Sequence, residues 1–243
     1  MIDRPTERFS PRAGAYASNR PGYPPEALDA LLDGLGSPAK LTIADVGAGT
    51  GIASRLLAER GATVFAVEPN HSMAEQAEPD PRVEWIDGTG EDTHLPSKSV
   101  DVAVAFQAFH WFEPDAAIEE FRRISRRRIA LVQYERDESE PFAAAYARLV
   151  RRYTLDDTEA RRAQALTAFA KLAGSSCNRS EHRYAQTLSN EQLLGRMAST
   201  SYLPNEGAAA EELRRGAGDL FDRFAQDGNV SLAMVCYVLV ADA

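Results

Sequence analysis

The chain has 243 residues, of which 44% are hydrophobic and 26% charged, and its 27 basic and 36 acidic side chains give a formal net charge of −9. These values indicate one folded domain over residues 1–243 with a large core; they exclude disorder and a fibre, and they argue against a nucleic-acid partner. No apolar stretch is long enough to span a membrane and residues 1–12 contain no apolar signal core, so a cytoplasmic location is expected.

The first half of the chain alternates between strand and helix after an irregular beginning. Residues 1–25 hold five of the 13 prolines and are predicted to form an N-terminal arm. Apolar runs predict strands over residues 41–46, 63–67, 83–86, 100–106 and 129–134. Amphipathic spacing predicts helices over residues 26–35, 52–60, 70–78 and 115–125.

The strand pattern also predicts how the sheet is built. Runs that are apolar almost throughout suit strands buried on both faces, and the helices between them provide the crossovers that parallel strands need. The sequence therefore predicts an α/β fold with a doubly wound, mostly parallel sheet. In the second half, helices over 140–153 and 158–173 are expected to form a helical lid spanning approximately residues 138–178. Later elements are a polar-alternating strand, two helices and a final central strand, at residues 181–188, 190–198, 208–225 and 230–240.

A glycine-rich turn lies between the first of these strands and the following helix. Residues 45–51 are Asp-Val-Gly-Ala-Gly-Thr-Gly, and glycines at alternate positions let the backbone turn tightly and approach a ligand. The helix that follows offers free N–H groups and a positive dipole end. A dinucleotide fingerprint would need glycine at position 52, which is Ile52, and no Gly-Lys-Ser/Thr phosphate-loop ending is present. A polar nucleoside-type cofactor is therefore predicted.

An acidic residue follows the second predicted strand. Glu68 lies seventeen residues after Gly51 and is followed by Pro69. A carboxylate at this place can accept hydrogen bonds from both hydroxyls of a ribose. Glu68 is predicted to bind the cofactor's sugar.

Together these residues resemble the class I S-adenosylmethionine-dependent methyltransferases, in particular the small-molecule group with the type 11 domain, over roughly residues 16–134. The resemblance implies a seven-stranded Rossmann-like sheet with an antiparallel last strand, and S-adenosyl-L-methionine as cofactor. It also implies that Thr89, Gly90 and Glu91 surround the adenine, although many relatives have an acid in place of Thr89. The other cofactor-binding residues that it implies are Asp45, Gly47, Ala48, Gly49, Gly51, Glu68, Pro69, Met73 and Gln107.

Residues 107–112, Gln-Ala-Phe-His-Trp-Phe, follow the fourth predicted strand and should face the cofactor's sulfur. They and residues 16–24 resemble the subgroup that includes trans-aconitate methyltransferases. The resemblance implies that Tyr16 and Arg20 close over the cofactor, and that Tyr23, Phe109 and Trp111 line the substrate pocket. Aromatic faces suit a sulfonium cation. His110 is the candidate catalytic base, with loop packing as the alternative.

Three functions are compatible with these residues. The first is methyl transfer to a small-molecule acceptor. The second is cyclisation of the cofactor to azetidine-2-carboxylate with release of methylthioadenosine, and the third is cofactor binding without catalysis. A nicotinamide oxidoreductase is opposed by Ile52, and the histidines and cysteines show no metal-ligand spacing, so no metal site is predicted. The acceptor and the oligomeric state are left open.

Overall fold

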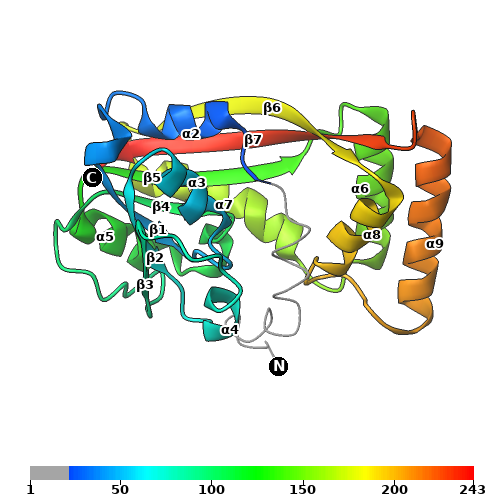
Figure 1. The fold of residues 1–243 in the computed structure, drawn as a ribbon, viewed down its shortest axis with the longest axis horizontal. Coiled ribbons are helices and arrows are strands. Elements are labelled where there is room, and N and C mark those ends of the chain that lie inside the picture. Colours follow the sequence, from blue (N-terminus) through cyan, green and yellow to red (C-terminus); the bar gives the residue numbers. More distant parts are fainter. Residues whose placement is uncertain (1–21) are drawn as a thin grey trace.

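The computed structural model describes residues 22–243, which form a seven-stranded sheet with helices on both faces (Figure 1). The strand order is β3-β2-β1-β4-β5-β7-β6, and β7 runs antiparallel to both of its neighbours. The predicted doubly wound, mostly parallel sheet is confirmed. Its strands are β1 (Thr42–Val46), β2 (Thr63–Val67), β3 (Val83–Ile86), β4 (Val100–Phe106), β5 (Ser125–Arg136), β6 (Asn178–Leu188) and β7 (Val230–Asp242).

The central parallel strands are buried because helices cover both of their faces. β1 and β4 are apolar along almost their whole length, and both strands are buried from end to end except for one half-buried residue in each. Val46 at the end of β1 pairs with Val67 at the end of β2, and β4 runs parallel on the other side of β1. The carboxyl ends of β1, β2 and β4 therefore meet at one edge, where ligands bind in open α/β sheets.

One face of the sheet carries α2 (Pro25–Leu32), α3 (Ile52–Glu59) and α6 (Pro141–Tyr153), and the other carries α5 (Pro114–Ile124) and α7 (Thr158–Ala173). The long strands β6 and β7 extend past the parallel strands, and α6, α8 (Asn190–Ala198) and α9 (Gly207–Phe224) lie at their far end (Figure 1). The predicted lid segment thus contains two helices on opposite faces of the sheet. Its action as a lid stays a prediction. Short helices are η2 (Pro38–Lys40), α4 (His71–Ala74) and η3 (Phe109–Trp111).

The largest differences from the predicted bounds concern two elements. The helix predicted over residues 70–78 is reduced to α4, where the Asn70 side chain caps the Met73 N–H; after Ala74 the chain continues in turns, with the Gln76 and Ala77 N–H groups donating to the Met73 and Ala74 carbonyls. β5 begins at Ser125, four residues before the predicted start, because Ser125 pairs with Val100 of β4, and Arg128 pairs with Val102 of β4 and with Asp242 of β7. Long-range pairing therefore overrides local composition there.

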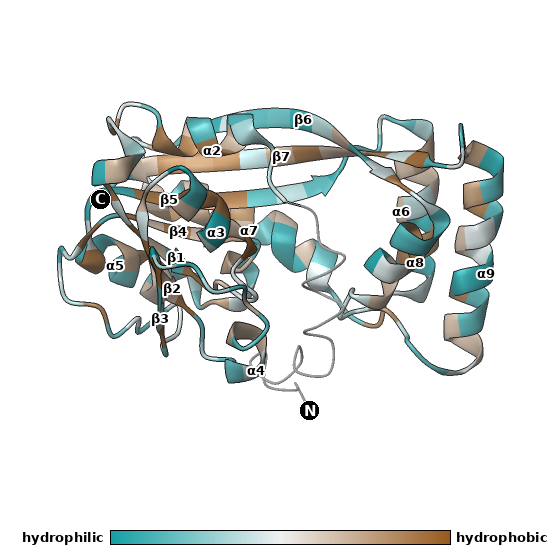
Figure 2. Cartoon of the chain, in the orientation of Figure 1, coloured by the Kyte–Doolittle hydropathy of each residue, from teal (hydrophilic) through white to brown (hydrophobic). Residues whose placement is uncertain are grey.

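β6 forms an edge of the sheet, and its sequence suits that place. Along this strand, exposed and half-buried residues alternate, and most of the ribbon is hydrophilic in contrast to β7 beside it (Figure 2). Charged side chains on an edge strand oppose pairing with other chains. No helix within residues 22–243 is long and apolar enough to cross a membrane.

Candidate active site

A cavity of ≈ 200 Å³ lies at the carboxyl ends of the parallel strands. Its walls come from the turns after β1, β2, β3 and β4, which is the arrangement that the sequence predicts. Two tyrosines from outside these turns complete it. The lining residues are Tyr23, Gly47, Ala48, Gly49, Thr50, Ile52, Ala53, Glu68, Pro69, Asn70, Met73, Thr89, Gly90, Glu91, Phe106, Gln107, Ala108, Trp111, Phe112 and Tyr134.

The glycines of the turn after β1 have different physical roles. Gly47 and Gly49 line the cavity with φ values of +75° and +61°, which favour glycine. A Cβ atom at Gly47 would lie 2.5 Å from the Cβ of Ala108, so the turn can approach β4 only without a side chain. Gly51 has φ +74° and lies outside the cavity lining, where a Cβ would meet the Trp85 ring at 3.0 Å. Gly51 thus permits packing behind the turn.

Glu68 is fixed at the cavity wall by two backbone groups. The Gly49 N–H donates to Oε2 at 2.8 Å, and the Asn70 N–H donates to Oε1 at 2.9 Å. Burial raises the pKa of the Glu68 carboxyl, and these two hydrogen bonds offset part of that rise. A carboxylate has about four acceptor positions, so each oxygen keeps one for a ligand hydroxyl. The geometry suits a vicinal diol.

Asp45 is fully buried at the end of β1 and does not line the cavity. The Ser54 hydroxyl donates to its Oδ2 at 2.6 Å, whereas Oδ1 has no hydrogen-bond partner within residues 22–243. Burial raises the pKa of Asp45 to about 7, against the lowering effect of the Ser54 bond, and the negative charge of Glu68 raises it further. Its predicted contact with the cofactor is therefore not direct in this structure.

The aromatic residues after β4 divide between the cavity and the core. Trp111 and Phe112 line the cavity, and a Cβ atom at Gly90 would lie 2.5 Å from the Phe112 ring. Phe109 is 1% exposed, with ring centroids of Phe121 and Phe169 at 6.3 and 5.4 Å. The structure thus places Phe109 in the core and not on the predicted pocket wall.

His110 is buried beside Trp111, with their ring centroids 4.7 Å apart, and it does not line the cavity. Its role as a base stays a prediction.

Gln107 does line the cavity, with a strained φ of +55°. Its Nε2 donates to the Tyr134 carbonyl at 2.8 Å, and its N–H donates to the Val132 carbonyl at 3.0 Å. These two bonds hold the strained residue against β5.

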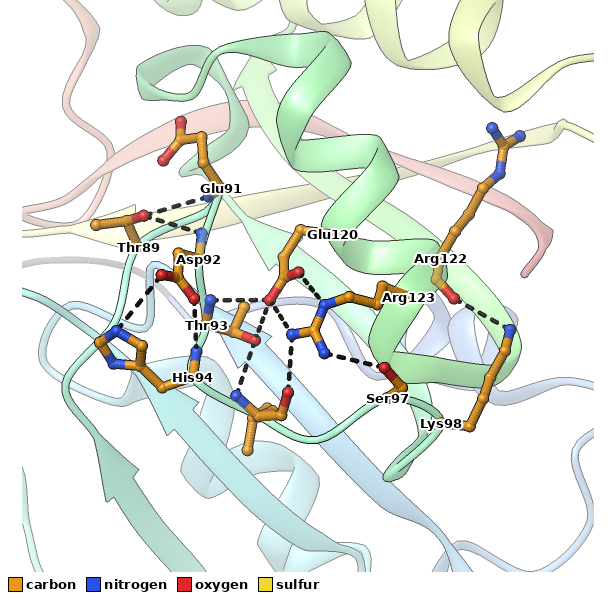
Figure 3. Close-up of polar contacts among 11 residues, drawn as sticks. Thr89, Glu91, Asp92, Thr93, His94, Ser97, Lys98, Glu120, Arg122 and Arg123 are labelled. Atoms are coloured by element: carbon orange, nitrogen blue, oxygen red, sulfur yellow. Dashed lines mark hydrogen bonds and ion pairs between the residues drawn. The ribbon is translucent and has the colours of Figure 1, made fainter.

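The turn after β3 is attached to α5 through a buried carboxylate (Figure 3). Glu120 Oε1 accepts from the Thr93 N–H at 2.9 Å and from the Thr93 hydroxyl at 2.5 Å, and Arg123 donates to both carboxylate oxygens. Burial raises the pKa of Glu120, but the hydrogen bonds from Arg123 and Thr93 outweigh it, and the pKa is lowered overall. This network fixes the segment that continues from the cavity residues Thr89 and Glu91.

We expect Glu120→Gln to lower the free energy of unfolding by about 1–3 kcal/mol, because an amide leaves part of this network without its charged acceptor. Urea unfolding measures the change. Glu119→Gln is the matched control, since Glu119 is the exposed neighbour on the same helix. Equal unfolding free energies for the two variants would show that the network contributes no stability.

Sixteen of the eighteen predicted site residues lie within residues 22–243, and twelve of these sixteen line the cavity. Asp45, Gly51, Phe109 and His110 do not line it, and Tyr16 and Arg20 lie outside the described residues. Sequence reasoning missed the last residues of β4 and the aromatic end of β5, although both follow the strand-end rule. The lining residues outside the predicted segments are Ile52, Ala53, Asn70, Phe106 and Tyr134, and the predicted segments 45–51 and 107–112 also contribute Thr50, Ala108 and Phe112.

The seven-stranded sheet with its antiparallel β7 agrees with the class I S-adenosylmethionine-dependent methyltransferase domain that the sequence resembles. Residues 44–131 match the family model described as a methyltransferase domain, and they contain most of the cavity wall. S-adenosylmethionine is the methyl donor of this class of domain.

Among curated proteins, an uncharacterized methyltransferase of Mycobacterium tuberculosis is 41% identical over 133 residues, which cover 54% of this chain and 53% of that protein. A protein of Dictyostelium discoideum described as a candidate methyltransferase is 32% identical over 126 residues, which cover 52% of this chain and 48% of that protein. The chain thus spans about half the length of the curated relatives it matches. A solved structure of a candidate type II methyltransferase from Anaeromyxobacter dehalogenans is 27% identical, with a TM-score of 0.70 and coverage of 92% of this chain and 97% of that chain.

Proposed function

We propose that this protein transfers the methyl group of S-adenosylmethionine to a small-molecule acceptor. The observation that carries the proposal is a cavity with two unlike walls. One wall holds the Glu68 carboxylate, fixed by the backbone of Gly49 and Asn70. The other is aromatic, with Trp111 and Phe112 from the turn after β4.

The residues present suit each part of the cofactor. The free acceptor positions of Glu68 match the two ribose hydroxyls. Met73 is 4% exposed and lines the cavity beside Gly49, where its apolar side chain suits the adenine face. Gly90 lets the Phe112 ring pack directly against its backbone, because a Cβ atom there would lie 2.5 Å from the ring. The N-terminus of α3, directly after the glycine turn, favours the negative end of an amino acid.

When bound, the cofactor supplies an electrophilic methyl group on a positively charged sulfur. The faces of Trp111 and Tyr23 stabilise such a cation by about 0.5–2 kcal/mol each, depending on how far it is desolvated. The buried rings of Phe106 and Tyr134 contact Tyr23, with centroids at 4.8 and 5.6 Å, and keep this wall dry. Holding both reactants in line is the larger effect and can supply about 7–11 kcal/mol.

Residues 16–24 and 107–112 resemble the trans-aconitate methyltransferase subgroup, and this resemblance supports an assignment of the chain to that subgroup. Trp111 and Tyr23 line the cavity as that likeness implies.

Product analysis distinguishes methyl transfer from cyclisation. Purified protein incubated with S-adenosylmethionine should form S-adenosylhomocysteine only when an acceptor is added. Methylthioadenosine formed without an acceptor would instead establish cyclisation.

We expect Glu68→Gln to weaken S-adenosylhomocysteine binding about 10- to 100-fold, because a hydrogen bond to a charged group contributes about 1.5–3 kcal/mol and the amide also opposes a backbone donor. Isothermal calorimetry measures the dissociation constant. Glu84→Gln on β3 is the matched control, since Glu84 is exposed and does not line the cavity. An unchanged dissociation constant for Glu68→Gln would refute the ribose contact and with it the proposed cofactor.

A further inference from the structure

A second cavity, of ≈ 220 Å³, lies beside the first one. It is formed by the end of β5 with residues of α6, α7 and α8, and Tyr134 lines both cavities. Tyr134 is 4% exposed, and its carbonyl accepts the hydrogen bond from Gln107 of the first cavity. A molecule that occupies the second cavity therefore reaches the aromatic wall of the first at Tyr134.

The lining of this second cavity is far more polar than that of the first. Within residues 22–243, four arginines and three glutamates line it, an excess of one positive charge. Two of the glutamates are already paired: Glu159 with Arg136 and Arg151, and Glu138 with Arg151. The third, Glu135, accepts from the Gln133 side chain at 3.0 Å.

Two guanidinium groups in this cavity are held in a similar way. The Arg136 guanidinium lies 5.9 Å from the ring centre of Tyr146, and that of Arg162 lies 5.7 Å from the ring centre of Tyr202. Both rings are almost fully buried. Stacking on an aromatic face fixes the plane of a guanidinium and leaves its N–H edge available to a ligand.

Both groups also have a donor without an acceptor. The buried Nε–H groups of Arg136 and Arg162 have no hydrogen-bond partner within residues 22–243. Arg162 makes no ion pair with any carboxylate of that part of the chain. Its backbone carbonyl accepts a hydrogen bond of 3.1 Å from the side-chain Nε2 of Gln133 on β5. Buried donors of this kind call for an acceptor from a ligand.

We propose that the second cavity binds a carboxylate group of the methyl acceptor, with Arg162 as its principal partner. The fork of donors on a guanidinium matches a carboxylate in two parallel hydrogen bonds. The single excess positive charge favours a monoanion over a doubly charged phosphate ester. This inference rests on the proposed function. It assigns the carboxylate to anchoring, while the atom to be methylated lies beyond Tyr134 in the first cavity.

The test uses three carboxylic acids, each beside its uncharged primary amide: benzoate and benzamide, phenylacetate and phenylacetamide, hexanoate and hexanamide. Each compound is titrated by calorimetry into the full chain, both alone and saturated with S-adenosylhomocysteine, and phenyl phosphate is included as a dianionic arm. We expect at least one acid to bind and its amide to bind at least about tenfold more weakly. Binding of S-adenosylhomocysteine is measured separately from binding of the acids. A protein that does not bind S-adenosylhomocysteine would refute the proposed function, whereas the acid titrations test the carboxylate site on their own.

Variants then assign the site. We expect Arg162→Gln to weaken acid binding at least about tenfold while leaving S-adenosylhomocysteine affinity unchanged, and Arg162→Lys to keep part of the binding. Arg148→Gln on α6 is the matched control, because Arg148 is exposed and lines neither cavity. Equal binding of acid and amide, no binding of any acid, tighter binding of phenyl phosphate, or full binding by Arg162→Gln would each overturn the proposal.

Discussion

Replacement of Gly47 by alanine is expected to weaken S-adenosylhomocysteine binding by about 30-fold or more. Two costs combine at this position. The left-handed backbone, with φ +75°, costs an alanine about 1–2 kcal/mol. The new Cβ would lie 2.5 Å from the Ala108 Cβ and 3.1 Å from the Phe112 ring, and such overpacking costs about 1–3 kcal/mol.

The turn can relieve this contact only by moving, because the atom it meets is a Cβ and not the end of a flexible side chain. Movement would also strain the 2.8 Å bond from the Gly47 N–H to the Val67 carbonyl, which joins the turn to β2 and so to Glu68. Calorimetric titration and urea unfolding together divide the cost between affinity and stability.

Gly34→Ala is the control for backbone strain alone. Gly34 also has a positive φ, of +73°, but a Cβ there would meet nothing within 4 Å, and the residue does not line the cavity. It should lose stability by about 1–2 kcal/mol and keep its cofactor affinity. If Gly47→Ala behaved like Gly34→Ala, the close approach of the turn to β4 would have no part in cofactor binding.

The second large effect concerns the pH dependence of stability, and it comes from Asp45. The pKa of this carboxyl is raised from 3.8 to about 7 in the folded protein by burial. Between these values the native state keeps a proton that the unfolded chain releases, so the free energy of unfolding falls as pH rises. The contribution of Asp45 is fully present below pH 4 and is lost as pH rises through about 7.

Asparagine at position 45 cannot ionise. We therefore expect the free energy of unfolding of Asp45→Asn, relative to that of the natural protein, to rise by roughly 2–4 kcal/mol from pH 5 to pH 8. Each unit by which the pKa is raised contributes about 1.4 kcal/mol. Urea unfolding of both proteins at several pH values in this range gives the difference. Apart from Glu68, whose charge interacts with that of Asp45, the other titrating groups are common to the two proteins and cancel. A difference that stays constant with pH would mean that Asp45 ionises in the folded state near its ordinary pKa.

Several features of the fold could be predicted because they depend on neighbours in sequence. The strands over residues 63–67, 83–86 and 100–106 are short, mostly apolar runs, and each is found with the predicted bounds. The glycine turn is specified by the need for positive φ at Gly47 and Gly49, which few other residues satisfy. Glu68 follows from its place at the end of an apolar strand. In each case the physical requirement is local.

The direction of each aromatic side chain after β4 could not be predicted. Phe109 and Phe112 are three residues apart, yet Phe109 packs into the core on Phe121 and Phe169 while Phe112 lines the cavity against Gly90. The short helix η3 between them is oriented by its packing on α7, which lies about fifty residues further along the chain. Periodicity within one segment contains no information about that contact.

What the sequence alone determined is the succession of strands and helices, the class of sheet and the edge of the sheet at which the cofactor is proposed to bind, because apolar runs and glycine turns act over a few residues. Only the tertiary structure decided that Tyr134 joins two cavities and that Arg136 and Arg162 lie together in the second one. Tyr134 and Arg136 lie on β5 and Arg162 lies on α7. In the chain, α6 with a turn at each end separates these two elements. Their meeting depends on long-range packing between elements, and no local pattern of residues specifies it.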